Sequence, residues 1–299
     1  MGKTTGNSKR SLRFFLTLLA GLACLPFASN AANASSAFRA VTYNIWGLTV
    51  PFLTQPSRIT DIARLLPSLN ADVVALEETF TKKAKILTQI HEYPYQAWGP
   101  SKSGLIQNSG LLLLSKWPIV ETATRRYSRC AGNDCLSHKG ILYARIRVDG
   151  IGDINIFSTH QNSAGCDTLR ELQVAELAQF VREHQGSFPS LILGDFNVAP
   201  TSRPYEDMKT LLQVRDTHEE FVGANPGLSE TARNGFSFDR LRNTHVSKKE
   251  PPRRIDYIWA ADSSTQHIDV TKSELVFDAP VYGRFLSDHF GVQADLEFE

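Results

Sequence analysis

The chain has 299 residues and nearly balanced charge, with 32 Lys and Arg against 31 Asp and Glu. A protein that binds nucleic acid mainly through phosphates usually carries a basic surplus, so this composition argues against a general nucleic-acid partner. No Pro-, Gly- or Ser-rich linker interrupts the chain, and this favours one large domain over several small ones.

Residues 1–34 have the composition of a secretory signal peptide. Four basic residues and no acid precede an apolar run from Phe14 to Cys24, and the small-residue stretch ASNAANASS follows. The run is too short for a spanning helix. We expect cleavage after Ala31 or Ala34, and a secreted or periplasmic protein in which residues 35–299 form a single domain with 28 basic against 31 acidic residues, a charge of −3. An uncleaved membrane anchor and a lipidated Cys24 are the alternatives.

Apolar runs bounded by turn residues alternate with helical patterns through residues 38–299. Strands are predicted at 38–45, 72–76, 109–114, 141–148, 153–158, 190–193, 254–259 and 292–297. Helices are predicted at 58–66, 82–91 and 168–185, and the polar segment 219–252 is predicted to be a long loop. Many strands with a few long helices indicate an α/β fold in which two packed β-sheets are flanked by helices.

Three cysteines follow the signal peptide, namely Cys130, Cys135 and Cys166. Secretion favours a disulfide. Three cysteines allow three pairings and leave one thiol over. The chain has no Cys-x-x-Cys or Cys/His metal pattern, so a structural zinc site is not expected.

Polar side chains recur at the ends of the predicted strands. They are Asn44, Glu77 and Glu78, His160, Asp195 and Asn197, Asp256, and Asp288 and His289. Each one alone is compatible with a turn or a helix cap. Their recurrence at six strand ends indicates instead a cleft with rigid walls. Asp195 and Asn197 are two residues apart, so an extended backbone would point both toward the same face.

The residue types in this set favour metal-assisted hydrolysis of a phosphoester. The set contains acids, amides and imidazoles, but no serine or cysteine nucleophile beside a base. Oxygen ligands select a hard divalent cation, which we expect to be Mg²⁺. Such an ion neutralises phosphate charge, an imidazole deprotonates water, and amide donors hold the oxyanion.

The motifs in their order along the chain resemble the endonuclease/exonuclease/phosphatase superfamily. They are Asn44, Glu78, Thr159-His160, Gly194-Asp195-Phe196-Asn197, Arg254-Ile255-Asp256-Tyr257 and Ser287-Asp288-His289. The stretches YNIWGL, LLSKWPI, LSHKGILYARI and THQN are most similar to secreted neutral sphingomyelinases. The resemblance implies a DNase I-like four-layer sandwich that spans nearly all of residues 38–299.

The resemblance also implies roles for the nucleophile side of the site. Glu78 would be the central ligand of one Mg²⁺, which Mn²⁺ or Co²⁺ could replace, with Asn44 beside it. His289 would be the general base on water, oriented by Asp256. Asp288 would be a further metal ligand or the alternative orienting acid.

On the phosphate and leaving-group side, the resemblance assigns Asp195 and Asn197 to positioning water and phosphate. His160 would protonate or polarise the leaving group, and Lys139 would face the phosphate. Asp134, five residues before Lys139, and Trp46 would contact the substrate. The family's secreted members also imply a disulfide between Cys130 and Cys166, with Cys130–Cys135 as the local alternative.

One departure concerns membrane contact. The chain has only DAPVYGRFL in place of the long aromatic hairpin of related bacterial enzymes. The apolar stretch WGLTVPFLT, residues 46–54, either fills the core or serves as a shallow bilayer anchor in its place.

These observations predict a monomeric, secreted, Mg²⁺-dependent phosphodiesterase with peripheral membrane contact. It would hydrolyse sphingomyelin to ceramide and phosphocholine by direct water attack. The alternatives are a secreted nuclease or other phosphoesterase of the same fold, a phospholipase C on other choline lipids, and a catalytically inactive membrane-binding protein.

Overall fold

The first of two mixed sheets combines strands from both ends of the chain. The computed structural model describes residues 1–2, 6, 36–48 and 56–299. In the first sheet the strand order is β11-β12-β1-β2-β4-β3, and only β1 and β2 are parallel neighbours. Its strands are β1 (Ser36–Asn44), β2 (Val73–Glu77), β3 (Tyr95–Trp98), β4 (Leu112–Ser115), β11 (Ile268–Val276) and β12 (Gly291–Phe298).

The second sheet has the order β5-β6-β7-β8-β10-β9, and its parallel pair is β7 with β8. Its strands are β5 (Ile119–Arg126), β6 (Gly140–Val148), β7 (Gly152–His160), β8 (Ser190–Asp195), β9 (Arg215–Asp216) and β10 (Asp256–Ala261). Close approach of the parallel pair requires Gly194, because a Cβ there would lie 1.9 Å from the carbonyl oxygen of Thr159.

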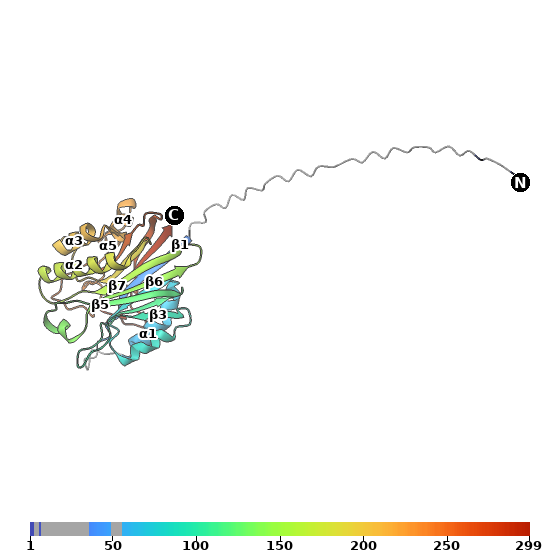
Figure 1. Ribbon diagram of the computed structural model, residues 1–299. Coiled ribbons are helices and arrows are strands. Elements are labelled where there is room, and N and C mark those ends of the chain that lie inside the picture. Colours follow the sequence, from blue (N-terminus) through green and yellow to red (C-terminus); the bar gives the residue numbers. More distant parts are fainter. Residues whose placement is uncertain (3–5, 7–35, 49–55) are drawn as a thin grey trace. The chain divides into compact units, whose positions relative to one another are not determined.

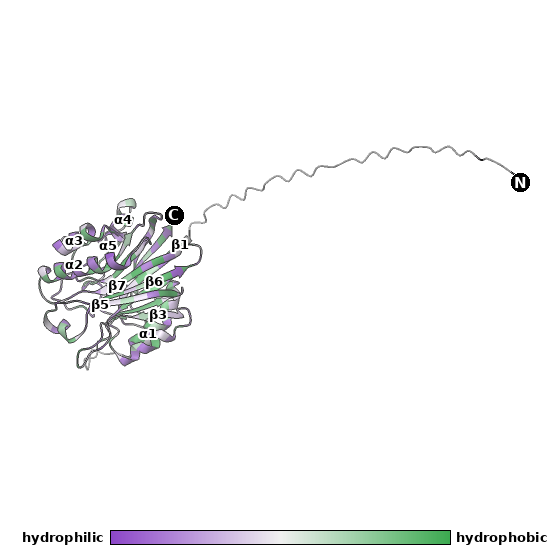
Figure 2. Ribbon diagram, in the orientation of Figure 1, coloured by the Kyte–Doolittle hydropathy of each residue, from purple (hydrophilic) through white to green (hydrophobic). Residues whose placement is uncertain are grey.

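Helices cover the outer faces of both sheets (Figure 1). The outer face of the first sheet packs against α1 (Pro56–Leu65), η1 (Leu66–Leu69) and η2 (Lys82–Gln89), and that of the second against α2 (Asp167–His184) and α3 (Arg203–Leu212). The remaining helices are η3 (Gly132–Leu136), α4 (Thr217–Ala224) and α5 (Glu230–Asn234). Figure 2 shows hydrophobic residues concentrated on the strands. This arrangement confirms the predicted α/β class and the two packed sheets flanked by helices.

The two sheets face each other across an apolar core that becomes polar at one end. Strand side chains alternate between faces. In β1, Phe38 and Ala40 enter the core between the sheets, and Thr42 and Asn44 follow on the same face. In β2, β7 and β8 apolar residues are likewise followed by Glu77, His160 and Asp195, and in the antiparallel β10 Asp256 comes first and the apolar residues follow it. The predicted site residues therefore lie at the polar end of this inter-sheet core.

The predicted central strands are all present, and the differences are confined to short or peripheral elements. The segment 82–89 is a 3₁₀ helix, and strands β3, β5, β9 and β11 and helix α3 were not predicted. The predicted loop 219–252 is wrong in part, because it contains most of α4 and all of α5.

Two predictions about membranes fall largely outside the described residues. The proposed signal peptide lies there except for residues 1–2 and 6, and Val50, Phe52 and Leu53 of the apolar stretch lie there as well. Among the helices that the structure describes, none is both long and apolar enough to cross a bilayer.

Candidate active site

A cavity of about 450 Å³ opens at the polar end of the inter-sheet core. Of the predicted site residues, the following line it: Trp46, Glu78, His160, Asp195, Asn197, Asp288 and His289. Asp134 and Lys139 line an adjoining pocket of about 360 Å³, and Glu78 and Leu48 line both. Asn44 and Asp256 are buried and contact these residues by hydrogen bonds. The structure thus brings the predicted catalytic, metal and substrate residues together.

One side of the site is built on a histidine–aspartate pair. Nδ1 of His289 lies 2.8 Å from Oδ2 of Asp256, so the Nδ1–H donates to the carboxylate. Nε2 of His289 lies 3.9 Å from Oδ2 of Asp195. Burial alone lowers the pKa of His289, but the Asp256 carboxylate outweighs it, so this pKa lies well above its usual value. Asp256, rather than Asp288, is therefore the acid that orients this imidazole.

The opposite side holds a histidine beside a lysine. Nζ of Lys139 lies 2.8 Å from each of Nε2 of His160, the carbonyl oxygen of Gln161 and Oδ1 of Asp134. An ammonium has no acceptor, so Nε2 of His160 must accept and Nδ1 carries the ring proton. Burial, together with the Lys139 ammonium, lowers the pKa of His160 to about 3. This imidazole is neutral, and its Nδ1 is buried without a protein partner among the described residues.

Asp134 is held by more than its ion pair with Lys139. One carboxylate oxygen accepts from the backbone N–H of Ser163 at 2.8 Å, from that of Ala164 at 3.1 Å and from the Ser163 hydroxyl at 3.0 Å. Burial raises the pKa of Asp134, but Lys139 and these donors reverse the effect and lower it. The position of Asp134 between Lys139 and the loop after β7 makes it a residue that fixes Lys139.

Asn44 links the two sheets across the site. Its Nδ2 donates to Oε1 of Glu78 at 3.3 Å and to Oδ2 of Asp195 at 3.1 Å, and its Oδ1 accepts from the backbone N–H of Trp46. Glu78 has a left-handed backbone with φ of 58°, which turns its side chain from the strand toward the cavity. Glu77 instead faces the core, where Thr42 donates to it at 2.8 Å. This difference favours Glu78 over Glu77 as a ligand.

The residues around Glu78 fit a divalent cation. Oε2 of Glu78 is buried without a hydrogen-bond partner among the described residues. Burial and the nearby Asp288 raise the pKa of Glu78 to about 7, and burial raises the pKa of Asp288. A cation would compensate these two desolvated acids. The carboxylates of Asp195 and Asp256 and the ring of His289 also lie within 4.8 Å of one another, but Asp256 and His289 already engage each other.

Asn197 lines the cavity, but with a backbone conformation that the sequence did not predict. Strand β8 ends at Asp195, and Asn197 has a left-handed φ of 53°. The prediction that an extended backbone points both side chains to one face is therefore wrong, although both line the cavity. Nδ2 of Asn197 donates to the carbonyl oxygen of Gln161 at 3.2 Å.

The predicted Cys130–Cys166 disulfide is wrong. Cys130 is bonded to Cys135, and Cys166 is free and exposed. Helix η3 folds the chain back between Cys130 and Cys135, so that their Cα atoms lie 5.3 Å apart, within the range that a disulfide spans. Cys166 instead precedes the first residue of α2.

Several residues of the site were missed by sequence reasoning. Phe238 packs on the His289 ring with centroids 5.0 Å apart, and Arg253 pairs with Glu250 at the cavity wall. The hydroxyl of Ser287 donates to the carbonyl oxygen of Asn44 at 2.7 Å and accepts from the backbone N–H of His289. Phe238, Glu250 and Arg253 lie in or beside the segment predicted as a loop, where no periodic pattern marks them.

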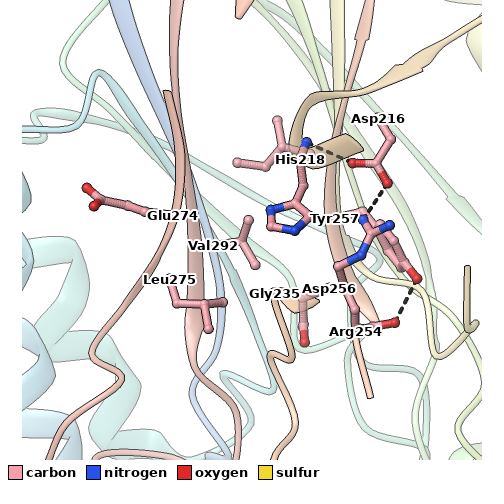
Figure 3. Close-up of a pocket in the computed structure, with 10 residues that line it drawn as sticks. Asp216, His218, Gly235, Arg254, Asp256, Tyr257, Glu274, Leu275 and Val292 are labelled. Atoms are coloured by element: carbon pink, nitrogen blue, oxygen red, sulfur yellow. Dashed lines mark hydrogen bonds and ion pairs between the residues drawn. The ribbon is translucent and has the colours of Figure 1, made fainter. Parts of the chain in front are cut away.

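Arg254 belongs to the same motif as Asp256, but its contacts lie outside the catalytic cavity. It pairs with the buried Asp216, and the Tyr257 hydroxyl donates to the Arg254 carbonyl oxygen at 2.7 Å. Figure 3 shows these residues beside Asp256 around a small cavity of about 10 Å³, which has room for about one water molecule. We interpret this small cavity as structural, because the charged groups that line it are already paired.

Comparison with known proteins identifies the family. The model of the Endonuclease/Exonuclease/phosphatase family matches residues 41–289. Sphingomyelinase C 2 of Leptospira interrogans is 30% identical over 228 residues, which cover 66% of this chain and 34% of the relative. Phospholipase C of Staphylococcus aureus is 26% identical over 313 residues, which cover 89% of this chain and 90% of the relative. The chain thus spans about a third of the Leptospira relative.

Solved structures show the same fold. Sphingomyelinase C from Streptomyces griseocarneus aligns with a TM-score of 0.67 at 22% identity, over 87% of this chain and 99% of that one. A beta toxin variant from Staphylococcus aureus with bound magnesium ions aligns with a TM-score of 0.64 at 22% identity, over 87% and 99%. TDP2 from D. rerio, complexed with a single-strand DNA product, aligns with a TM-score of 0.71 at 18% identity, over 88% and 99%. These likenesses confirm the DNase I-like fold.

Proposed function

The chain belongs to the endonuclease/exonuclease/phosphatase family, and on that premise we propose that it is a secreted, Mg²⁺-dependent phosphodiesterase that hydrolyses sphingomyelin to ceramide and phosphocholine. The observation that carries this proposal is the opposed pair of histidines. His289 is paired with the Asp256 carboxylate and His160 with the Lys139 ammonium, and both rings line one cavity, with Asp195 between them at 3.9 Å from Nε2 of His289 and 3.3 Å from Nε2 of His160. A direct displacement at phosphorus needs these two environments, one to activate water and one to assist the leaving oxygen.

On the nucleophile side, His289 acts as the general base. In the neutral ring Asp256 keeps the proton on Nδ1, so Nε2 accepts the proton of water, and a bound divalent cation would favour this neutral form over the imidazolium that the surrounding acids stabilise. Water attacks phosphorus, one of its protons passes to Nε2, and a new O–P bond forms. Asp195, 3.9 Å from Nε2, and the neighbouring Asn197 are placed to hold the attacking water and the phosphate.

On the leaving-group side, Lys139 and His160 act together. Nζ of Lys139 holds His160 in its neutral form, and the Nδ1–H, which has no protein partner among the described residues, would donate a hydrogen bond to the oxygen that departs. The P–O bond to ceramide breaks, and the ceramide oxygen gains a proton from this side or from water. Asp134 pairs with Lys139 at 2.8 Å and fixes its position.

Glu78 would hold the Mg²⁺ ion, with the amide of Asn44 and the carboxylate of Asp288 beside it. When bound, the ion would supply Lewis-acid neutralisation of the phosphate charge. Asn44 would also fix the spacing between Glu78 and Asp195, because it donates to both.

A nuclease is the second candidate function, since TDP2 shares the fold. Nucleic-acid binding would need unpaired basic residues near the cavity. Arg253, the described arginine that lines the cavity, pairs with Glu250, whereas Lys102 and Arg126 near the adjoining pocket are exposed. The pairing of Arg253 and the slight acidic surplus of residues 35–299 favour a lipid phosphodiester over DNA.

The deciding experiment offers the purified protein sphingomyelin, phosphatidylcholine and single-stranded DNA side by side, with Mg²⁺ and with EDTA. We expect release of phosphocholine from sphingomyelin with Mg²⁺, none in EDTA, and restoration when Mg²⁺ is added back. Faster cleavage of DNA would replace this function with the nuclease. Full activity in EDTA would contradict the metal requirement.

A further inference from the structure

Three apolar side chains stand out in solvent beside the pocket that holds Lys139. Leu105 is 99% exposed, Leu136 67% and Ile106 40%. Exposed apolar side chains that gather in one place usually mark an interaction surface. None of these residues takes part in the catalytic steps proposed above.

The three side chains lie on two segments that pair with each other. Residues 103–106 form a tight turn, closed by hydrogen bonds between Ser103 and Ile106 in both directions. The backbone N–H of Gln107 then donates to the carbonyl oxygen of Leu136 at 2.9 Å. The turn that carries Leu105 and Ile106 is thus fixed against the end of η3 that carries Leu136. We call Leu105, Ile106 and Leu136 the apolar rim.

The apolar rim adjoins the 360 Å³ pocket, which has a polar and an apolar part. Leu136, Phe80 and Leu48 supply apolar wall, and Lys139 and Glu78 supply the charged groups. Leu48 and Glu78 also line the catalytic cavity. A continuous path therefore runs from the catalytic groups past Lys139 to the exposed rim.

The chemistry of the reaction decides which half of the substrate takes this path. In a direct displacement the attacking water and the departing oxygen lie on opposite sides of phosphorus. His289 and His160 both line the catalytic cavity, and Lys139, which contacts His160 at 2.8 Å, lines the adjoining pocket. The departing ceramide oxygen then lies on the Lys139 side, and the hydrocarbon attached to it faces Phe80 and Leu136.

We propose that the pocket beside Lys139 takes the ceramide half of the substrate and that the apolar rim enters the outer layer of the bilayer that holds it. This inference rests on the proposed function. The charge around the rim agrees with a phospholipid surface. Residues 99–110 include the exposed Lys102 and no acid, and exposed Arg126 is tied to the same loop through the carbonyl oxygen of Ser101. Basic side chains beside apolar ones suit a lipid phosphate layer.

The test compares the double variant Leu105→Asp/Ile106→Asp with the matched control Leu211→Asp. Leu211 is 45% exposed and lies near the C-terminal end of α3, on the outer layer of the second sheet. Vesicles of equimolar sphingomyelin and phosphatidylcholine serve as the probe. Binding is measured by co-sedimentation in EDTA. Turnover with Mg²⁺ is measured on vesicles and on a soluble phosphocholine ester of a chromogenic alcohol.

We expect the double variant to bind vesicles about tenfold or more weakly, and its ratio of vesicle to soluble turnover to fall by a similar factor. The control should keep the wild-type ratio. If the double variant and the wild type bind vesicles equally, the proposed role of the apolar rim is overturned, even if sphingomyelin is hydrolysed. Vesicle binding that depends on the rim, without hydrolysis of sphingomyelin by the wild type, supports the surface and rejects the proposed function. The proposal is also overturned if the double variant changes only the self-association of the protein.

Discussion

The two sides of the catalytic cavity use the same side chain in opposite electrostatic settings. His289 donates to the Asp256 carboxylate, whereas His160 accepts from the Lys139 ammonium. The pKa of His289 is raised well above its usual value and that of His160 falls to about 3, although both rings are buried. Burial is common to both, so the partner decides the proton affinity of each ring.

The two sides of the cavity also differ in the elements that carry the partner residues of the two histidines. Asp256 begins β10 and faces the core between the sheets, while Lys139 precedes β6 and is held by Asp134 from helix η3. One side of the cavity is therefore set by strand geometry, and the other by a loop that an ion pair and a disulfide restrain. We expect substitutions on the two sides to differ in how they depend on substrate and on stability.

Loss of the base should give the largest effect. His289→Ala should lower kcat by about 10²–10⁴-fold, the usual contribution of general-base catalysis. The loss should be equal for sphingomyelin and for the chromogenic phosphocholine ester, because the base acts on water and not on the leaving group. Steady-state kinetics on both substrates measure this, with circular dichroism as the control for folding. More than about a tenth of the wild-type rate would mean that the base is another residue.

The effect of removing His160 on turnover should depend on the leaving group. His160→Ala should lower turnover of sphingomyelin by about 10²-fold. It should affect the chromogenic ester much less, because a stable phenolate needs little help to depart. The ratio of the two losses is the measurement. Equal losses on both substrates would show that His160 does not assist departure.

Removal of the carboxylate beside Lys139 should appear mainly in stability. Lys139 is 5% exposed, so Asp134→Asn leaves a buried ammonium without its counter-charge. We expect the free energy of unfolding to fall by about 2 kcal/mol, measured by urea denaturation. The double variant Asp134→Asn/Lys139→Met should recover part of the loss, because it removes the unpaired charge. No recovery would indicate that the hydrogen bonds to Ser163 and Ala164 matter more than the pair.

The smallest effects should come from the cysteines of the loop side. Cys135→Ser opens a short ring and should lower the free energy of unfolding by at most about 2 kcal/mol. Cys166→Ser should leave the melting temperature unchanged, since this thiol is free and exposed. Peptide mapping without reduction gives the pairing directly. A Cys130–Cys166 peptide would contradict the local bridge.

The central strands and most of the site were predictable because each rests on a short-range pattern. Nearly continuous apolar runs mark β1 and β8 as strands that are buried on both faces, and Asn44 and Asp195 end these strands as expected. The Glu78, His160 and His289 motifs were recognisable for the same reason. Glu78 and His160 are polar residues at the ends of strongly apolar strands, and His289 lies just before the last strand.

The remaining features depend on tertiary contacts. The edge strand β5 exposes much of its length, so it lacks the apolar run that marks a buried strand. The backbone of Asn197 leaves the extended conformation after β8, which no two-residue spacing reveals. The contact of Lys139 with His160 and the contact of the Phe238 ring with His289 join residues that are distant in the chain. A preference for Cys130–Cys135 over Cys130–Cys166 likewise depends on how η3 folds back.

The hydrogen bond from Asn44 to Asp195 joins a strand of one sheet to a strand of the other. The distance between Glu78, which follows a strand of the first sheet, and Asp195, in the second, thus depends on the spacing of the two sheets, which residues such as Phe38 and Leu193 set from within. Packed interiors transmit small changes in volume over several residues. The core of this protein therefore acts as a spacer for its chemistry. Methyl groups remote from the cavity help to define how far apart the carboxylates of Glu78 and Asp195 are held.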